Sequence, residues 1–285
     1  MQAPPKLVCR DTVLDLTEPV VMGILNVTPD SFSDGGRLAD SEAAVEWGLA
    51  MAAEGAAIID VGGESTRPGA APVGLEDELA RVVPVIERLA RRARVPISID
   101  TTKPEVMRAA VAAGACLIND VRALQAPGAL AAAAETGAGV CLMHMRGEPR
   151  TMQVDPQYRS VVDDVRNDLG ARIAACEAAG IPRERICIDP GIGFGKRPEH
   201  NLALLAALDR LADPGIPVLV GVSRKSLLGI ITGRPTGERL AGSVALAALS
   251  VMRGAAIIRA HDVAATVDAV KVASALRRAA AGGSG

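Results

Sequence analysis

The stretch PISIDTTKPEVMRAAVAAGACLIND (96–120) decides the fold, because it holds two short apolar runs on either side of a helical pattern. The runs are PISID (96–100) and CLIND (116–120), and PEVMRAAVAAG (104–114) lies between them. Continuous apolar strands separated by a helix are typical of parallel strands that are covered on both faces. This stretch therefore predicts one strand–helix–strand unit of an α/β protein.

The same alternation runs through the chain. The further strand-like runs are VVMGILNV (20–27), AIIDVG (57–62), GVCLMHM (139–145), ICIDPG (186–191), PVLVGVS (217–223) and AAIIRAH (255–261). Helical patterns include 42–55, 75–93, 163–180 and 239–254, and several end on a glycine suited to a left-handed C-cap: Gly55, Gly114, Gly180 and Gly254. Eight units followed by a last helix at 264–280 predict a closed (β/α)8 TIM barrel, with an open doubly wound sheet as the alternative.

Length and composition fit one domain over 1–285. Hydrophobic residues make up 49% of the chain and charged residues 22%, an ordinary mix for a folded protein with a large core. The segment KLVCRDTVLDL (6–16) predicts a short hairpin that closes the N-terminal mouth of the barrel, and AGGSG (281–285) predicts a disordered tail. No linker composition marks a domain boundary.

Charge and cysteine usage exclude several classes of function. The formal net charge is −2 with scattered Lys and Arg, which argues against nucleic-acid or membrane-surface binding. The five cysteines show neither a CxxC pair nor metal-ligand spacing with histidine, so free thiols in a reducing cytoplasm are expected. There is no N-terminal signal pattern and no apolar run long enough to span a bilayer.

Polar residues end one predicted strand after another. They are Asn26, Asp60, Asp100, Asn119 with Asp120, His144, Asp189, Ser223, and Arg259 with His261. In a barrel these ends meet on the face where active sites lie, so we expect them to form one site. Asp100, Asn119 and Asp189 can accept hydrogen bonds from a flat polar heterocycle. Arg67, Lys225, Arg259 and His261 supply cations for phosphate oxygens.

The glycine-rich GIGFGK (191–196) has the spacing of neither a P-loop nor GxGxxG, so it does not indicate nucleotide binding. It carries Phe194, one of only two phenylalanines; the other, Phe32, lies in GILNVTPDSFSDGG (23–36). Two phenylalanines that both lie in loops after strands predict ring stacking on a ligand rather than core filling. For His144 the expectation is a satisfied buried histidine, and for His200 a surface position.

Taken together, these segments resemble the bacterial dihydropteroate synthase family. The matching stretches are GILNVTPDSFSDGG (23–36), DVGGESTRPGA (60–70), SIDTTKP (98–104), IND (118–120), MHMRGEPRTMQ (143–153), DPGIGFGK (189–196), GVSRKS (221–226) and RAHDV (259–263). They follow the family's order across nearly the whole chain. The resemblance implies a transferase of folate biosynthesis that condenses 6-hydroxymethyl-7,8-dihydropterin pyrophosphate with p-aminobenzoate, with Mg²⁺. It also implies a TIM barrel, a homodimer and a sulfonamide target.

The resemblance also implies roles for single residues. The catalytic set would be Lys225, Asp100, Arg259 and His261. The pterin pyrophosphate would contact Thr66, Asp100, Asn119, Met143, Asp189, Phe194, Gly221, Lys225, Arg259 and His261. The p-aminobenzoate site would be framed by Phe32, Thr66, Arg67, Pro68, Lys225 and Ser226. Asn26 would ligate Mg²⁺, with Asp34 assisting when the first loop closes.

Two other readings stay open from the sequence. A methyltetrahydrofolate–corrinoid methyltransferase shares the barrel and the pterin cradle, but it binds no pyrophosphate and so would not need Asn26, Arg259 or His261. A non-catalytic relative would bind pterin or a partner protein without turnover. The residues that a synthase requires are all present, which favours the synthase.

Overall fold

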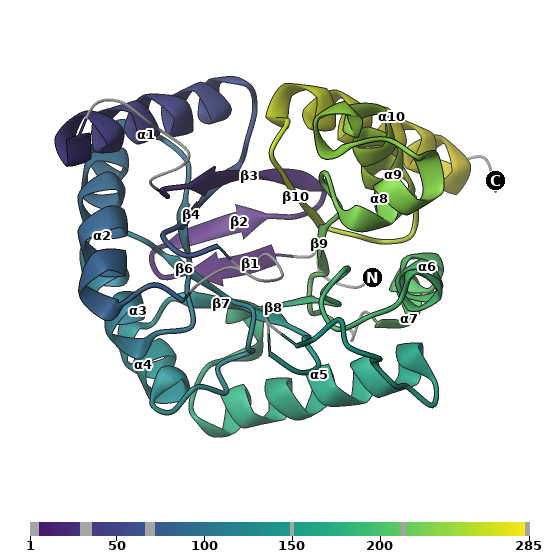
Figure 1. Cartoon of the computed structure of the whole chain (residues 1–285), viewed down its shortest axis with the longest axis horizontal. Coiled ribbons are helices and arrows are strands. Elements are labelled where there is room, and N and C mark those ends of the chain that lie inside the picture. The colour runs from purple at the N-terminus through teal and green to yellow at the C-terminus, as the bar shows by residue number, and fades with distance from the viewer. Residues whose placement is uncertain (1–5, 29–35, 66–71, 149–150, 212–214, 283–285) are drawn as a thin grey trace.

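The computed structural model describes residues 6–28, 36–65, 72–148, 151–211 and 215–282, and its centre is an eight-stranded parallel barrel (Figure 1). The strands are β3 (Val20–Asn26), β4 (Ile58–Gly62), β5 (Ile97–Asp100), β6 (Leu117–Asp120), β7 (Gly139–Met143), β8 (Ile186–Asp189), β9 (Leu219–Gly221) and β10 (Ile257–Ala260). They pair in the order β8-β7-β6-β5-β4-β3-β10-β9. A parallel bridge between Ile188 and Val218 joins the two ends of this order. The prediction of a TIM barrel over an open sheet is confirmed.

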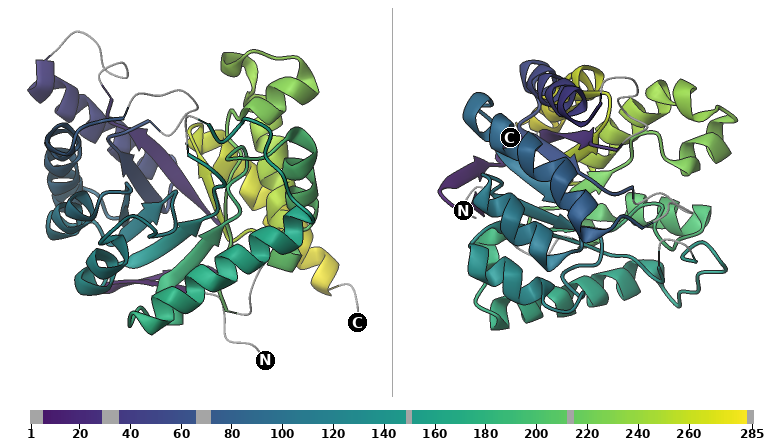
Figure 2. Two further views of the ribbon diagram at one scale, coloured as in Figure 1. Left: turned by 60° about the horizontal axis from the view of Figure 1, so that its bottom comes forward. Right: turned by 60° about the vertical axis from the view of Figure 1, so that its left-hand side comes forward.

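Helices surround the strands (Figures 1 and 2). They are α1 (Gly36–Ala53), α2 (Leu75–Arg92), α3 (Pro104–Ala112), α4 (Ala129–Thr136), α5 (Val161–Ala178), α6 (Pro198–Ala206), α7 (Leu208–Leu211), α8 (Ser226–Thr232), α9 (Leu240–Met252) and α10 (Val263–Gly282), with 3-10 turns η2 (Arg183–Arg185) and η3 (Thr236–Glu238). Four of them, α4, α6, α7 and α8, were not among the helices named from the sequence; they span eight, nine, four and seven residues.

The predicted glycine caps and N-terminal hairpin are present. Gly55, Gly114, Gly180 and Gly254 all have positive φ, from +86° to +120°. The hairpin consists of β1 (Lys6–Cys9) and β2 (Thr12–Asp15), paired antiparallel. Its buried Leu7 and Cys9 pack among residues near the starts of the barrel strands, such as Leu117 and Leu219. The hairpin thus closes the N-terminal end of the barrel, as predicted.

The core has two parts. The larger part lies between strands and helices and is built almost wholly from Val, Ile, Leu and Ala. The smaller part fills the N-terminal end of the barrel, and it includes Cys9, Cys116, Cys141 and Cys187. All five cysteines are free and buried, so they pack as small apolar side chains.

The C-terminal end of the chain differs from the predicted disordered tail at 281–285. Helix α10 continues to Gly282, so the first two residues of the predicted disordered tail are helical. The alanine-rich end of this helix explains the extension, because each added residue of good helix propensity gains a backbone hydrogen bond. Within the described residues, none of the helices is both long and apolar enough to cross a membrane.

Candidate active site at the C-terminal mouth of the barrel

The strand ends bring the predicted polar residues to one level of the barrel. In the parallel register Asp100 pairs with Asn119, and Met143 pairs with Asp189. Gly221 likewise pairs with Arg259. Paired positions of neighbouring parallel strands lie side by side, so these residues ring the same mouth although they come from six strands.

Arg259 links two carboxylates at this mouth. Its Nε donates to Asp60 Oδ2 at 2.6 Å, and its Nη2 donates to Asp100 Oδ2 at 2.8 Å. Asn119 Nδ2 also donates to Asp60 Oδ2, at 3.0 Å. Asp60 thereby orients both the cation predicted for phosphate and the amide predicted for pterin. From the sequence, Asp60 is predicted at a strand end but not among the substrate-binding residues. A carboxylate within the apolar run AIIDVG could have indicated that it lies in the site.

Burial disfavours the charged forms of two carboxylates at this mouth. Burial raises the pKa of Asp100, and Asp60 and Asp120 add repulsion that Arg259 opposes. Burial also raises the pKa of Asp189, although its Oδ1 accepts a 2.7 Å hydrogen bond from the Gly191 amide. Asp60 Oδ1 is fully buried and has no hydrogen-bond donor among the described residues. Groups held this way are typical of sites that bind a ligand with matching donors.

Lys225 and Phe194 meet across the mouth. The Lys225 ammonium lies 4.2 Å from the centre of the Phe194 ring, in a cation–π contact. Burial lowers the pKa of Lys225 to about 8, with Asp189 opposing the shift. Phe194 is half-buried, so it covers the mouth rather than filling the core. The stacking of this ring on a ligand stays a prediction.

His261 lies at the end of β10, fixed by Ser223 from the neighbouring strand end. The His261 amide donates to Ser223 Oγ at 3.2 Å, and the hydroxyl is 3.0 Å from His261 Nδ1. The Ser223 hydroxyl can donate its hydrogen to Nδ1 while it accepts from the amide, and in that arrangement Nε2 carries the ring proton. That proton suits contact with an anion.

Asn26 ends β3 beside Gly62, the end of β4. A side chain built at Gly62 would come 3.5 Å from Asp100 Cβ and 3.8 Å from Asn26 Oδ1, so the glycine keeps the space between these two residues open. The described residues contain no group of three His, Cys, Asp or Glu side chains arranged to hold a metal. One amide oxygen beside a site for phosphates nevertheless fits Mg²⁺, which takes few protein ligands and uses substrate phosphates.

A partly buried ion-pair network links the end of β4, the start of α2 and the segment after β5. Lys103 Nζ contacts both Glu64 and Glu78, and Thr101 Oγ1 donates to Glu78 at 2.6 Å. Glu64 also accepts a hydrogen bond from the amide of Val73, beyond the loop. Five residues predicted for the site lie outside the described residues: Phe32, Asp34, Thr66, Arg67 and Pro68.

Some predicted positions are placed away from the ring. Ser226 is exposed at the start of α8, where it lines a cavity of about 180 Å³ with Gly193. Asp120 turns to its own loop and accepts from the amides of Arg122 and Leu124. His144 is a satisfied buried histidine, as expected. His200, expected on the surface, is half-buried because its ring packs edge-on against Tyr158.

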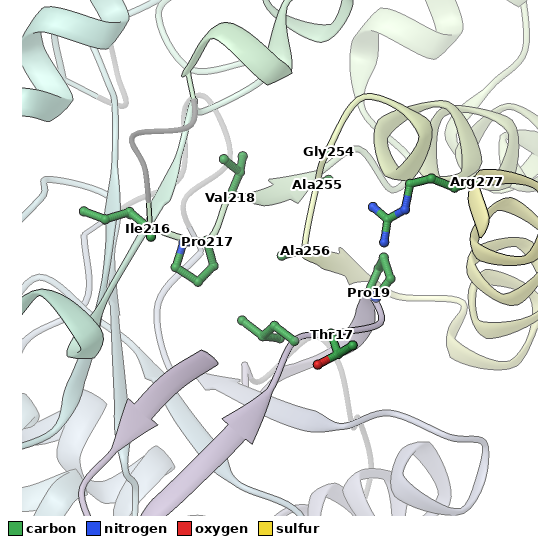
Figure 3. A pocket seen from close by; sticks show the side chains of 11 residues that line it. Thr17, Pro19, Ile216, Pro217, Val218, Gly254, Ala255, Ala256 and Arg277 are labelled. Atoms are coloured by element: carbon green, nitrogen blue, oxygen red, sulfur yellow. The ribbon is translucent and has the colours of Figure 1, made fainter. Parts of the chain in front are cut away.

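The described residues at the N-terminal end of the barrel form a cavity of a different kind. A cavity of about 160 Å³ lies near the starts of β9 and β10, between Pro19, Pro217 and Ala256 (Figure 3). Its lining is mainly apolar side chains and backbone, with Arg277 as its one charged residue. The C-terminal mouth is therefore the candidate active site.

Comparisons with known proteins identify the family of the chain. Residues 22–261 match the model of the family described as pterin binding enzyme. A dihydropteroate synthase of Escherichia coli K12 is 54% identical over 270 residues, covering 95% of this chain and 96% of that protein. The chain belongs to the dihydropteroate synthase family.

Solved structures show the same fold around the relevant ligands. The Xanthomonas albilineans synthase with 4-aminobenzoic acid has a TM-score of 0.91 and 55% identity, and the alignment covers 96% of this chain and 99% of that one. The Burkholderia cenocepacia synthase complexed with 7,8-dihydropteroate has a TM-score of 0.88 and 53% identity, over 97% and 98% of the two chains. These two relatives share the fold of this chain and were solved with 4-aminobenzoic acid and with 7,8-dihydropteroate.

Proposed function

We propose that the C-terminal mouth condenses 6-hydroxymethyl-7,8-dihydropterin pyrophosphate with p-aminobenzoate, giving 7,8-dihydropteroate and pyrophosphate. The observation that carries this assignment is the joint placement of Asp100, Asn119 and Asp189 with the cations Arg259 and Lys225 at one level of the barrel. Three acceptors match the amino–pyrimidine edge of a pterin, and the cations match a carbonyl and a phosphate.

The proposed step balances simply. The bond between the pterin methylene carbon and the pyrophosphate oxygen breaks, its electron pair leaves with pyrophosphate, and the amine nitrogen bonds to the same carbon and loses a proton to solvent. Arg259 and His261 would offset the charge on the departing oxygen. The arylamine is neutral at pH 7 and needs no strong base, so positioning supplies most of the catalysis.

Mg²⁺ is part of the proposal. Asn26 would hold the ion, and Mg²⁺ would supply positive charge that offsets the negative charge of the leaving group. Asn26 has a suitable oxygen at the open side of Gly62, and the predicted assistance from Asp34 falls outside the described residues. Lys225 and Ser226 would frame the p-aminobenzoate site together with Thr66, Arg67, Pro68 and Phe32, which lie outside the described residues.

A homodimer in the cytoplasm completes the proposal. Helices α9 and α10 lie side by side (Figure 1), and they expose Leu249, Met252, Val272 and Leu276. Large apolar side chains gathered on neighbouring helices are the composition expected of a subunit interface. Five free buried thiols suit a reducing compartment.

The test is a turnover assay with purified protein, the pterin pyrophosphate, labelled p-aminobenzoate and Mg²⁺. The proposal expects labelled dihydropteroate in the complete mixture and a large loss when a chelator removes Mg²⁺. A methyltransferase or a non-catalytic relative would yield no such product. Tight binding of the pterin ligand without product would favour the non-catalytic reading.

A further inference from the structure

Lys196 is the one Lys or Arg that is fully buried among the described residues. The residue is 2% exposed, and its ammonium donates to three backbone carbonyl oxygens: those of Gly191 and Phe194 at 2.9 Å and that of His144 at 3.2 Å. Its Nζ is also 3.0 Å from His144 Nδ1. An ammonium has three hydrogens and here faces four acceptors, so all of its hydrogens are engaged within these two loops.

The loops that Lys196 joins are packed backbone against backbone. A Cβ at Gly191 would lie 1.9 Å from the carbonyl oxygen of His144, and one at Gly195 would lie 2.2 Å from that of Arg146. Both glycines have positive φ. The loop after β8 therefore rests directly on the loop after β7, and carbonyl oxygens crowded at this contact need a donor.

His144 extends the network to the surface. Its Nε2 lies 3.2 Å from Asp168 Oδ2, while Nδ1 faces the Lys196 ammonium. Since an ammonium can only donate, Nδ1 accepts and Nε2 carries the proton. Burial lowers the pKa of His144 to about 3, with the charges of Lys196 and Arg146 adding to the shift, so the ring is neutral at pH 7.

The charge of Lys196 is costly to bury and must be compensated there. Burial lowers its pKa to about 7; Asp189 opposes the shift, and Lys225 and Arg146 add to it. The three carbonyl oxygens favour the ammonium, because hydrogen bonds to a charged group stabilise its charged form. The Lys196 ammonium therefore holds the three carbonyl groups in place.

We propose that Lys196 is a positioning residue for the pterin slot. By holding the carbonyls of Gly191 and Phe194, it fixes the loop that places the Phe194 ring against Lys225. The same loop carries the Gly191 amide that orients Asp189. This inference rests on the proposed function, because it assigns Lys196 a role in binding that substrate without touching it.

A double-mutant cycle with Phe194 tests the inference. Lys196→Met removes the ammonium but keeps an unbranched side chain, and Phe194→Leu removes the ring. We expect each single variant to weaken binding of the pterin pyrophosphate about tenfold, as loss of charged hydrogen bonds or a ring contact does. The double variant should bind like one of the singles, because both changes remove the same positioned ring. Lys271→Met, an exposed lysine on α10, is the matched control and should bind like wild type.

The outcomes separate this inference from the function on which it rests. If wild type does not bind the pterin pyrophosphate, the proposed function fails. If wild type binds and folded Lys196→Met binds equally well, or if the losses of the two single variants multiply in the double, the positioning role is wrong while the function stands.

A measurement on wild type covers the case in which Lys196→Met does not fold. The chain has five lysines, Lys6, Lys103, Lys196, Lys225 and Lys271, so selective ¹⁵N labelling gives at most five ammonium signals. The Lys196 signal should persist against exchange with water and shift when the pterin pyrophosphate binds. Rapid exchange like that of Lys271, or a signal unmoved at ligand saturation, would overturn the proposal.

Discussion

Arg259 Nη2 donates to Asp100 Oδ2 at 2.8 Å, so the cation predicted for the pyrophosphate and a carboxylate predicted for the pterin ring already form an ion pair. Arg259 also holds Asp60, and all three side chains are largely buried. The groups predicted to bind the two halves of the substrate therefore interact with each other. Any change in Arg259 affects the pterin carboxylates as well as the phosphate contacts.

His261 allows a second test of the pyrophosphate site, because its ring is hydrogen-bonded to Ser223, which is not one of the carboxylates that Arg259 binds. His261→Ala should weaken binding of the pterin pyrophosphate about tenfold or more, and binding of the free pterin alcohol much less. Arg259→Met should show the same preference with some loss for both ligands. Titration calorimetry with the two ligands measures the ratio. Equal losses for both ligands in His261→Ala would remove it from the pyrophosphate site.

Lys225 predicts a pH limit. Its pKa is lowered to about 8 in the ligand-free protein, so the ammonium is present below that pH and is lost as the pH rises through it. Since kcat/KM reports groups of the free enzyme, kcat/KM for the pterin pyrophosphate should fall above pH 8. Lys225→Ala should lose nearly all turnover, and Lys225→Arg should move any remaining basic limb beyond pH 10. A wild-type profile flat to pH 10 would contradict the assignment.

Replacement of Lys103 is expected to lower the stability of the protein. Glu78 is fully buried, and Lys103 supplies its only cation in the ion-pair network of the described residues. Lys103→Met leaves that carboxylate without charge compensation, which should lower the free energy of unfolding by about 3 kcal/mol. Thermal or urea unfolding measures the change, with Lys271→Met as the control. Adding Glu78→Gln should recover part of the loss; a Lys103→Met protein as stable as wild type would show that the pair contributes little.

The proposed dimer interface predicts a change in mass. Val272→Glu places a charge on the exposed apolar face of α10 and should convert the dimer to a monomer, because an unpaired charge buried at an interface is costly. Val154→Glu is the matched control, since Val154 is also exposed but lies in another part of the surface. Light scattering after size-exclusion chromatography distinguishes the two masses. An unchanged mass for Val272→Glu would place the interface elsewhere, and a monomeric wild type would exclude the dimer.

The sequence predicted the barrel and much of its site because both depend on local order. Apolar runs alternating with helices specify parallel strands, and a closed barrel must bring strand ends such as Asp100, Asn119 and Asp189 to one face. The pairing of Asp60 with Arg259 could not be read in this way, since the two residues are 199 positions apart and nothing local links them. The burial of Lys196 could not be predicted either, because the local sequence GFGK is typical of a flexible loop. Only the packing of this loop on the preceding one removes the lysine from water.

The most direct test of the central claim measures dihydropteroate and pyrophosphate together in one reaction of the purified chain with both substrates and Mg²⁺. The proposed displacement predicts equal molar amounts of the two products at every time point, and neither product when p-aminobenzoate is omitted. Pyrophosphate released without matching dihydropteroate would indicate hydrolysis instead of transfer. The absence of both products in the complete reaction would contradict the assignment of this mouth as a dihydropteroate synthase site.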